Sequence, residues 1–324
     1  MSLEPTLDLS IVIPVYNERD NLKDLHLELD EVLSRLGKSY EIILVDDGST
    51  DGSSEVLSEL AQEDSHLKVV VFRRNFGQTA AMSAGFDQAR GSVVVTLDAD
   101  LQNNPADIPK LIEKLNEGYD IVSGRRANRQ DKTLTRKVPS FLANRLISFM
   151  TGVHLKDYGC TLKAYRLEVV KGLRLYGEMH RFIPALASHM GVKVTEVDCS
   201  HRPRTRGTSK YGLNRTVRVF LDLLTVKFLL SYSTRPLQVF GSLGLACSGA
   251  GFIMLAHLTV QKFLFKIGIA DRPLLILGVF LGFLGVQLIT MGLLAELIIR
   301  TYHESQEKPI YVIRSILSKE ETTD

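Results

Sequence analysis

The stretch Ser92-Val93-Val94-Val95-Thr96-Leu97-Asp98-Ala99-Asp100-Leu101-Gln102 is a short apolar run that ends in two carboxylates one residue apart. Runs of this kind, rich in β-branched residues, are typical of a buried strand in a parallel sheet. Residues 9–14 and 40–45 have the same form. Polar residues follow both of them: Tyr16-Asn17-Glu18 after the first run and Asp46-Asp47-Gly48 after the second.

Helical patterns separate these runs. Apolar residues recur at three- and four-residue spacing along residues 21–36, 54–62, 79–90 and 108–116. Further short strands are predicted at residues 68–72 and 120–123. Alternation of strands and helices predicts a doubly wound α/β sheet. Because such sheets bind ligands beyond the carboxyl ends of their strands, we expect the polar clusters to form one site.

Two long stretches of the C-terminal third contain no Asp, Glu, Lys or Arg, residues 236–261 and 273–295. A bilayer core of ~30 Å is crossed by about 20 apolar residues of helix. We therefore predict two transmembrane helices, at about 236–259 and 274–298, which form a hairpin within residues 234–300. The domain outside the membrane is then residues 1–213, and residues 301–324 form a polar tail on the same side of the membrane.

Two segments beside the hairpin mix apolar residues with Arg and Lys, residues 138–153 and 214–233. Basic amphipathic helices of this type lie in the headgroup plane of a membrane, and we expect both segments to be interfacial helices. Helices that face a protein core give the same pattern, so that alternative stays open.

Composition excludes several other classes of protein. The net charge of +2 does not indicate a nucleic-acid binder. Cys160, Cys199 and Cys247 are far apart and have no CxxC spacing, which indicates reduced thiols and not disulfides or a zinc site. The chain has no phosphate-binding GxxxxGK[ST] loop and no GxGxxG turn. The histidines have no metal-ligand spacing, and we interpret His154, His180, His189 and His201 as structural or surface residues.

Asp98 and Asp100 have the spacing for two carboxylates to bind one divalent cation and leave room for diphosphate oxygens. Mg²⁺ and Mn²⁺ prefer such oxygen ligands. A cation at this position would neutralise the charge that builds up on a leaving diphosphate. The pair therefore predicts a metal-dependent transfer reaction.

Four motifs carry a resemblance to a known family: Ile11–Glu18, Val45–Gly52, Asn75-Phe76-Gly77 and Leu97–Gln102. In this order they resemble the family-2 glycosyltransferases with the GT-A fold. The whole chain, hairpin included, looks like a bacterial polyprenyl-phosphate glycosyltransferase of the bactoprenol glucosyltransferase and dolichyl-phosphate mannose synthase type. The resemblance implies inverting transfer of a hexose, expected to be glucose from UDP-glucose, onto undecaprenyl phosphate. It also implies a multi-pass protein of the inner (plasma) membrane with a cytosolic catalytic domain, and a homo-oligomer.

The resemblance also implies roles for individual residues. Pro14, Tyr16, Glu18, Asp46, Asp47 and Asp98 would bind the nucleotide, with Asp46 and Asp47 at its uracil or ribose end. Asp98, Asp100 and Gln102 would bind Mg²⁺ or Mn²⁺. Asp157 would face the acceptor as a proton acceptor or an orienting group, and with Asp100 it is the expected catalytic residue. Because an anionic acceptor needs cationic and hydroxyl partners, we expect its phosphate to contact Arg125, Arg136, Ser140, Arg206 and Lys210.

Three alternatives compete with glucose transfer. A processive polysaccharide synthase shares the paired aspartates, but its QxxRW motif needs a tryptophan, and this chain has none. Transfer of mannose or of a modified sugar such as aminoarabinose to the same lipid is a closer alternative. The last is a membrane-anchored scaffold that binds a nucleotide-sugar without catalysis.

Overall fold

The computed structural model describes residues 5–126, 147–148, 152–173, 175, 177, 179–188, 191–203, 236–268, 272–305 and 313–318. The chain divides into two compact units, and each is described by itself. The catalytic unit comprises residues 1–226 and 309–324, and the hairpin unit comprises residues 227–308. The predicted interfacial helices at 138–153 and 214–233 lie outside the described residues, except for residues 147–148 and 152–153.

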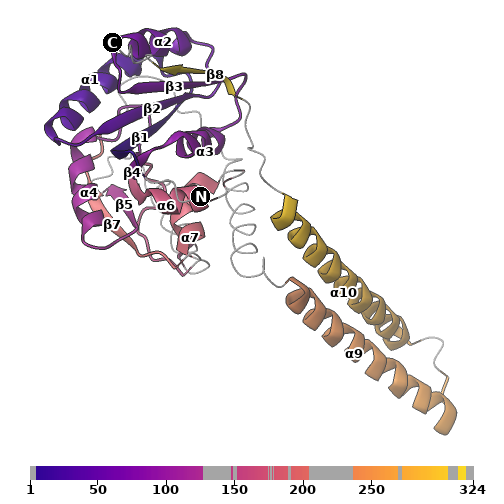
Figure 1. The fold of residues 1–324 in the computed structure, drawn as a ribbon. Helices are drawn as coiled ribbons and strands as arrows, with labels where there is room; N and C mark the ends of the chain where they lie inside the picture. Colours follow the sequence, from indigo (N-terminus) through magenta and orange to yellow (C-terminus); the bar gives the residue numbers. More distant parts are fainter. Residues whose placement is uncertain are drawn as a thin grey trace. The chain divides into compact units, whose positions relative to one another are not determined.

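Four parallel strands form the centre of the catalytic unit (Figure 1). They are β1 (Leu7–Val15), β2 (Tyr40–Asp46), β3 (Leu67–Phe72) and β4 (Gly91–Thr96), and they lie in the order β3-β2-β1-β4. Val15 pairs with Asp46, and Val12 pairs with Thr96. The strands therefore end near the same edge of the sheet, and the polar segments that follow β1, β2 and β4 gather there.

Helices cover both faces of this sheet, because its strands are apolar on both sides. On one face, α1 (Arg19–Arg35), α2 (Ser53–Glu63) and α4 (Ile108–Asn116) contribute to one apolar core with Ile11 and Ile13 of β1. On the other face lies α3 (Gln78–Gln88), packed so closely that a Cβ at Gly85 would be 2.2 Å from Val12 Cγ1. The doubly wound α/β fold predicted from the sequence is confirmed.

The sheet continues beyond the predicted strands. Its described part has eight strands in the order β7-β5-β6-β4-β1-β2-β3-β8, with β5 (Ile121–Arg126), β6 (Lys163–Arg166), β7 (Val194–Cys199) and β8 (Ile313–Ser318). Strand β6, which is followed by α6 (Leu167–Gly172), runs antiparallel between β4 and β5. The sequence analysis predicted β5 but missed β6 and β7, which lack a regular apolar pattern.

The tail is the clearest difference from the prediction. The sequence analysis expected a polar tail from residue 301, but the second membrane helix continues to Ser305, and β8 then pairs antiparallel with β3 at the edge of the sheet. Because β8 belongs to the catalytic unit, the chain leaves this unit, passes through the hairpin and returns to the same sheet.

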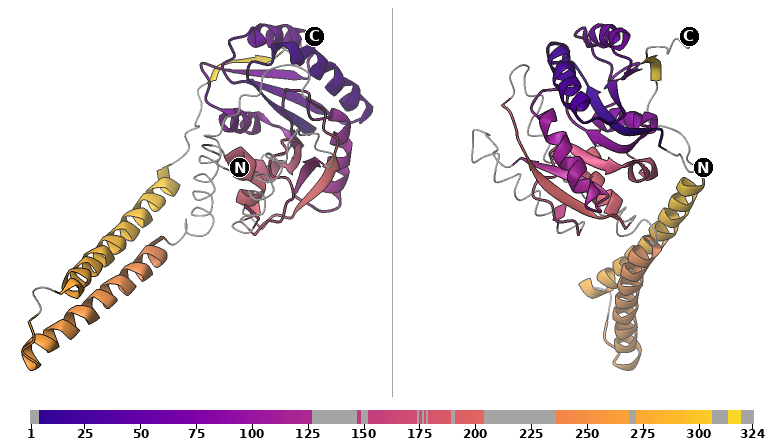
Figure 2. Two further views of the ribbon diagram at one scale, coloured as in Figure 1. Left: turned by 180° about the vertical axis from the view of Figure 1, so that it is seen from behind. Right: turned by 60° about the vertical axis from the view of Figure 1, so that its left-hand side comes forward.

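The hairpin unit consists of α9 (Pro236–Leu264) and α10 (Pro273–Ser305), shown side by side in Figure 2. Gly244 lies against Gly285, and Gly251 lies against Gly278 and Gly282, so the helices are antiparallel and their backbones are in close contact. Small residues permit such contact between membrane helices. Leu237–Leu264 and Pro273–Ile298 are long and apolar enough to cross a membrane.

Candidate active site

The loops that follow β1 and β2 are held together by hydrogen bonds. The Asn17 N–H donates to Ser49 Oγ (2.9 Å), and the Thr50 N–H donates to Asn17 Oδ1 (2.8 Å). The Glu18 N–H donates to Ser53 Oγ (3.1 Å). Asn17 has a φ of 54°, a left-handed conformation that asparagine tolerates better than most residues. These bonds fix the backbone on either side of the predicted nucleotide residues.

Three of the predicted nucleotide-binding residues lie in or beside the loop after β1, which these hydrogen bonds hold. Pro14 is half-buried at the end of β1, and Tyr16 is 36% exposed at the strand end. The Glu18 carboxylate accepts a hydrogen bond from Asn21 Nδ2 (2.6 Å), which orients it at the start of α1. The structure therefore brings Pro14, Tyr16 and Glu18 together, and their binding of nucleotide stays a prediction.

Asp46 and Asp47 have protein partners of their own. Asp46 is fully buried, and its carboxylate accepts from the Ser49 N–H (2.9 Å) and from Ser54 Oγ. Asp47 accepts from the N–H groups of Phe76 (2.6 Å) and Gly77 (2.9 Å). Both carboxylates therefore shape the loops of the site, whether or not they also contact a ligand.

Asp47 is electrostatically unusual. Asn75 Nδ2 gives its carboxylate a third hydrogen bond (2.9 Å). Burial nevertheless raises the pKa of Asp47 to about 6, because desolvation of the charged form outweighs the hydrogen bonds from Phe76 and Gly77. The nearby Asp46 charge raises this pKa further. Asp47 thus joins the loop after β2 to the loop after β3 at a cost in solvation.

These two loops are also in direct backbone contact at Gly48. Its φ of +68° is in the region that favours glycine. A Cβ at this position would lie 2.4 Å from the carbonyl carbon of Arg74 and 2.7 Å from Asn75 N. Glycine is therefore required here both by conformation and by the close approach of the next loop.

The paired aspartates follow β4 directly. Gln78 Nε2, from the first turn of α3, donates to Asp98 Oδ1 (2.7 Å), and the Gln102 N–H donates to Asp100 Oδ1 (3.2 Å). Leu101, between Asp100 and Gln102, has a φ of 59°. A non-glycine residue in this region stores strain, which is concentrated at functional sites in proteins.

The charge of Asp98 depends on its neighbours. Burial raises the pKa of Asp98 to about 6, and repulsion from Asp100 acts in the same direction. Lys163 and Arg126 lower this pKa. Two carboxylates that repel each other in a partly desolvated position are stabilised by a cation between them.

The residues present fit a divalent cation that takes part of its coordination from a substrate. In the described part of the chain, no group of three or more His, Cys, Asp and Glu side chains is arranged to hold a metal. Asp98 and Asp100 would supply two oxygen ligands, and diphosphate oxygens and water the others, which is how Mg²⁺ usually binds. The predicted ligand Gln102 is half-buried beside them, and its carbonyl accepts from the Arg202 N–H (3.0 Å).

Asp157 is held by Arg126, the residue that follows the predicted acceptor-binding Arg125. Arg126 of β5 donates to both carboxylate oxygens, Nε to Oδ2 (2.6 Å) and Nη2 to Oδ1 (2.8 Å). The Gly159 N–H donates to Oδ1 as well (3.1 Å). Both oxygens of the predicted catalytic carboxylate therefore already accept hydrogen bonds.

The predicted acceptor-binding residues are mostly outside the described part of the chain. Of the five, only Arg125 is described, and its guanidinium forms a bidentate pair with Asp198 and lies 3.7 Å from Glu196. It would have to leave Asp198 in order to bind a phosphate with the same fork. The other four lie outside the described residues: Arg136, Ser140, Arg206 and Lys210.

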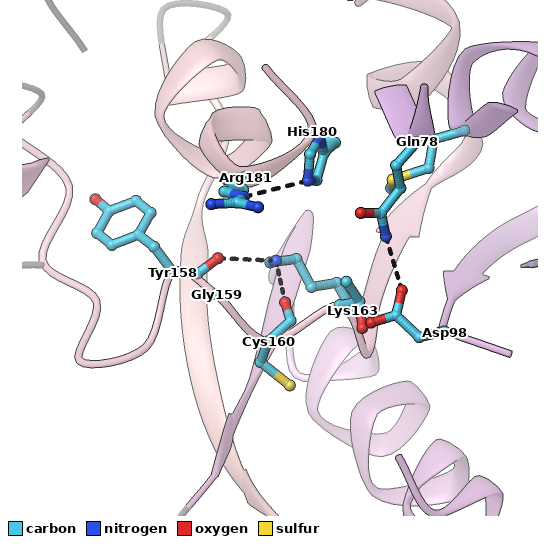
Figure 3. Close-up of a pocket in the computed structure, with 10 residues that line it drawn as sticks. Gln78, Asp98, Tyr158, Gly159, Cys160, Lys163, His180 and Arg181 are labelled. Atoms are coloured by element: carbon cyan, nitrogen blue, oxygen red, sulfur yellow. Dashed lines mark hydrogen bonds between the residues drawn. The ribbon is translucent and has the colours of Figure 1, made fainter. Parts of the chain in front are cut away.

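A pocket opens beside Asp98 (Figure 3). Its lining brings together α3, β6, the segment before β6, and the short helix η2 (Met179–Phe182). The lining residues are Gln78, Met82, Asp98, Tyr158, Gly159, Cys160, Thr161, Lys163, His180 and Arg181. His180 is only 5% exposed, so of the two roles predicted for it a surface position is excluded, and it forms part of the pocket wall.

The sequence analysis missed Gln78, Lys163 and Arg181 as site residues. Gln78 directly follows the Asn75-Phe76-Gly77 motif, and that position was a usable sequence signal. Lys163 and Arg181 are far along the chain from Asp98 and lie in no periodic pattern, so only the folded sheet shows that they share its pocket.

A doubly wound sheet with paired aspartates after a central strand, and a polar pocket beside them, is the arrangement expected of a GT-A glycosyltransferase. Residues 10–174 match the family described as "Glycosyl transferase family 2". The chain belongs to this family of enzymes.

Two related enzymes align with almost the whole chain. It is 44% identical over 315 residues to the dodecaprenyl-phosphate galacturonate synthase of Rhizobium johnstonii, which covers 96% of this chain and 93% of the relative. It is 38% identical over 326 residues to the undecaprenyl-phosphate 4-deoxy-4-formamido-L-arabinose transferase of Photorhabdus laumondii, which covers 100% and 98%.

Solved structures support the fold. Glucosyl-3-phosphoglycerate synthase from Mycobacterium tuberculosis, in complex with Mn²⁺, UDP and phosphoglyceric acid, superposes with a TM-score of 0.54. The identity is 18%, and the match covers 68% of this chain and 79% of the other. At this identity the likeness concerns the fold alone.

Proposed function

We propose that this protein transfers a modified sugar from a nucleotide-sugar donor to polyprenyl phosphate at a membrane. The near-complete alignment with the galacturonate synthase and the formamido-arabinose transferase carries this proposal, since both names specify a polyprenyl-phosphate acceptor. The same alignment favours a modified sugar over the glucose that the sequence analysis expected.

On the donor side, we assign the loops after β1 and β2 to the nucleoside and the paired aspartates to the diphosphate. Pro14, Tyr16, Glu18, Asp46 and Asp47 then form the walls of the nucleoside site. Asp98, Asp100 and Gln102 would hold Mg²⁺ or Mn²⁺, and the Mn²⁺–UDP complex of the mycobacterial enzyme of the same fold supports a divalent cation. When bound, the metal would stabilise the charge on the departing diphosphate.

On the acceptor side, an oxygen of the lipid phosphate attacks the anomeric carbon as the bond to the donor diphosphate breaks. The nucleoside diphosphate leaves with the bonding electrons, and the configuration at the anomeric carbon inverts. Because the second pKa of a phosphate monoester is ~6, the attacking oxygen is already charged at neutral pH. No strong base is required.

We assign Asp157 to orientation and not to proton transfer, because Arg126 already binds both of its oxygens. The Asp157–Arg126 pair would fix the segment that leads into the pocket. The phosphate partners proposed from the sequence, Arg136, Ser140, Arg206 and Lys210, would supply the compensating charge and hydroxyl group. The hairpin would anchor the enzyme in the inner membrane with the catalytic unit in the cytosol, and a homo-oligomer stays a prediction.

Transfer by the purified full-length protein in detergent tests the proposal. Undecaprenyl phosphate, Mg²⁺ or Mn²⁺ and a panel of UDP-sugars are supplied, and lipid products are identified by mass spectrometry. The expected result is one lipid-linked modified sugar. Metal-dependent UDP binding without any lipid product would instead support the non-catalytic scaffold. A Lys210→Ala variant is expected to raise the KM for lipid more than the KM for donor.

A further inference from the structure

The order of strands in the sheet indicates where the sugar of the donor would lie. Strands β2 and β1 carry the loops assigned to the nucleoside. Strand β4, which pairs with β1 on the side away from β2, carries the paired aspartates. The next strand along is β6, which contributes Lys163 to the pocket beside Asp98. A donor that follows this order would place its diphosphate at β4 and its sugar in the pocket at β6.

Two cationic side chains line this pocket. Lys163 is 2% exposed, and its ammonium group donates to the carbonyl oxygens of Cys160 and of Tyr158 (3.4 Å). Burial lowers the pKa of Lys163, whereas the charges of Asp157 and Asp98 raise it. Burying an amine is costly, and the two carbonyl oxygens and the nearby carboxylates compensate part of this cost. Lys163 thereby brings a positive charge to the wall of the pocket.

Arg181, the second cation, is positioned by a buried histidine. Its Nε–H donates to His180 Nε2 (3.3 Å). Because an arginine nitrogen can only donate, Nε2 accepts, and the neutral ring carries its proton on Nδ1. That proton is then donated to Thr79 Oγ1 (2.7 Å). Thr79 is adjacent to Gln78, which donates to Asp98, so hydrogen bonds and one peptide link connect Arg181 to the paired aspartates. Figure 3 shows the two ends of this chain, the Arg181–His180 and Gln78–Asp98 hydrogen bonds.

We infer that this pocket selects a donor sugar that carries a carboxylate, a hexuronic acid, and that Arg181 and Lys163 are the cations that bind it. This inference rests on the proposed function. Sugar hydroxyl groups can be bound by neutral side chains and by backbone groups. A carboxylate, in contrast, pairs with a guanidinium in a bidentate geometry and with an ammonium as a point charge. The galacturonate synthase among the relatives is consistent with such a donor.

Pairs of donors that differ only at C6 test the inference on the full-length protein. The pairs are UDP-galacturonate with UDP-galactose, and UDP-glucuronate with UDP-glucose, with undecaprenyl phosphate as acceptor. We expect kcat/KM for at least one uronate to exceed that of its neutral partner by about 100-fold or more, because a site built for a charged group rejects the analogue that lacks it. Calorimetric binding of the same donors gives the comparison without turnover.

Variants assign the preference to the two cations. Arg181→Gln is expected to lower kcat/KM for the uronate about 10- to 100-fold more than it lowers kcat/KM for the neutral donor. Lys163→Met should lower kcat/KM for both donors, because Lys163 also lowers the pKa of Asp98, but should lower it more for the uronate. Arg181→Lys should restore part of the uronate preference. Arg35→Gln is the matched control, since Arg35 lies on the surface of α1 and pairs with Glu31. Thermal unfolding of each variant shows whether it is folded.

Three results would overturn the inference. The first is a wild-type enzyme that uses the neutral donors as well as the uronates, which would leave the proposed lipid transfer intact. The second is an equal loss of binding affinity for all donors and for UDP in Arg181→Gln, which would assign the cations to the diphosphate. The third is a raised KM for lipid alone, which would assign them to the acceptor. Failure of the proposed function itself would differ, because no donor of any kind would yield a lipid product.

Discussion

Replacing Gly48 with alanine tests whether the two loops of the donor site are in backbone contact. The added Cβ would lie 2.4 Å from the Arg74 carbonyl carbon, and 2.7 Å from both Arg74 Cα and Asn75 N. These are backbone atoms, so no side-chain rotation relieves the overlap. The residue also keeps a φ of +68°, which costs an alanine about 1–2 kcal/mol.

Gly37 provides a matched control. Its φ is +60°, but a Cβ there would meet nothing within 4 Å. Gly37→Ala should therefore lower the free energy of unfolding only by the cost of placing an alanine at a positive φ, about 1–2 kcal/mol. Gly48→Ala should lower the free energy of unfolding by about 1–3 kcal/mol more than Gly37→Ala, the usual range for forcing an atom into a packed site. The difference between the two variants isolates the contact between the loops.

Unfolding of the full-length protein in detergent is followed by circular dichroism, because the chain has no tryptophan. The KM for the nucleotide-sugar is measured in parallel. Gly48→Ala is expected to raise this KM at least about tenfold, since the loop that carries Asp46 and Asp47 must move away from the loop at Asn75. Equal losses of stability in the two variants, with an unchanged donor KM in Gly48→Ala, would refute the reasoning.

Three further predictions concern the aspartates and the hairpin. Asp100→Asn keeps the size of the side chain but removes its charge, and should lower kcat by at least about a hundredfold without a change in thermal midpoint; near-wild-type turnover would contradict the metal assignment. The Asp47 carboxyl has a pKa of about 6 in the folded state and 3.8 as its ordinary value, so between these pH values the folded state holds a proton that the unfolded state has lost. The free energy of unfolding of the wild type should therefore fall as the pH rises through this window, by about 2 kcal/mol relative to that of Asp47→Asn. Denaturant titrations of both proteins at pH 4 and pH 7 measure this change. If the difference in unfolding free energy between the two proteins is the same at both pH values, the pKa of Asp47 is not raised. A Cβ at Gly285 would lie 2.0 Å from Ser248 Oγ, whereas one at Gly249 would meet nothing within 4 Å. Gly285→Leu should thus lower the thermal midpoint in detergent by several degrees and Gly249→Leu should not, and equal midpoints would contradict the packing of α9 on α10.

The donor side of the site was readable from the sequence, because local patterns encode it. Strands β1, β2 and β4 are continuous apolar runs, and a parallel sheet brings their carboxyl ends to one edge. The placement of Asp46 and Asp98 at that edge follows directly. The hydrogen-bond partners of these carboxylates do not follow, because no pattern indicates that Asp47 accepts hydrogen bonds from the loop at Phe76 and Gly77.

The pocket beside Asp98 could not be predicted from the sequence, because it depends on contacts between distant segments. Strand β6 has only four residues, and its place between β4 and β5 depends on antiparallel pairings that no apolar period predicts. The contact between His180 and Thr79 joins residues 101 positions apart. The hairpin, in contrast, was predictable in position because charge-free length alone indicates a membrane helix, although both helices are longer than predicted.

Strand β8 has a consequence for how the protein is made. It is synthesised after both hairpin helices, so the β3 edge of the sheet stays open until the membrane segment has left the ribosome. If only one helix crossed the bilayer, residues 313–318 would emerge on the opposite side from β3, and the two strands could not pair. With the proposed two-span topology, completion of the sheet would report correct membrane insertion, and a misinserted chain would keep an unpaired sheet edge of the kind from which aggregation starts.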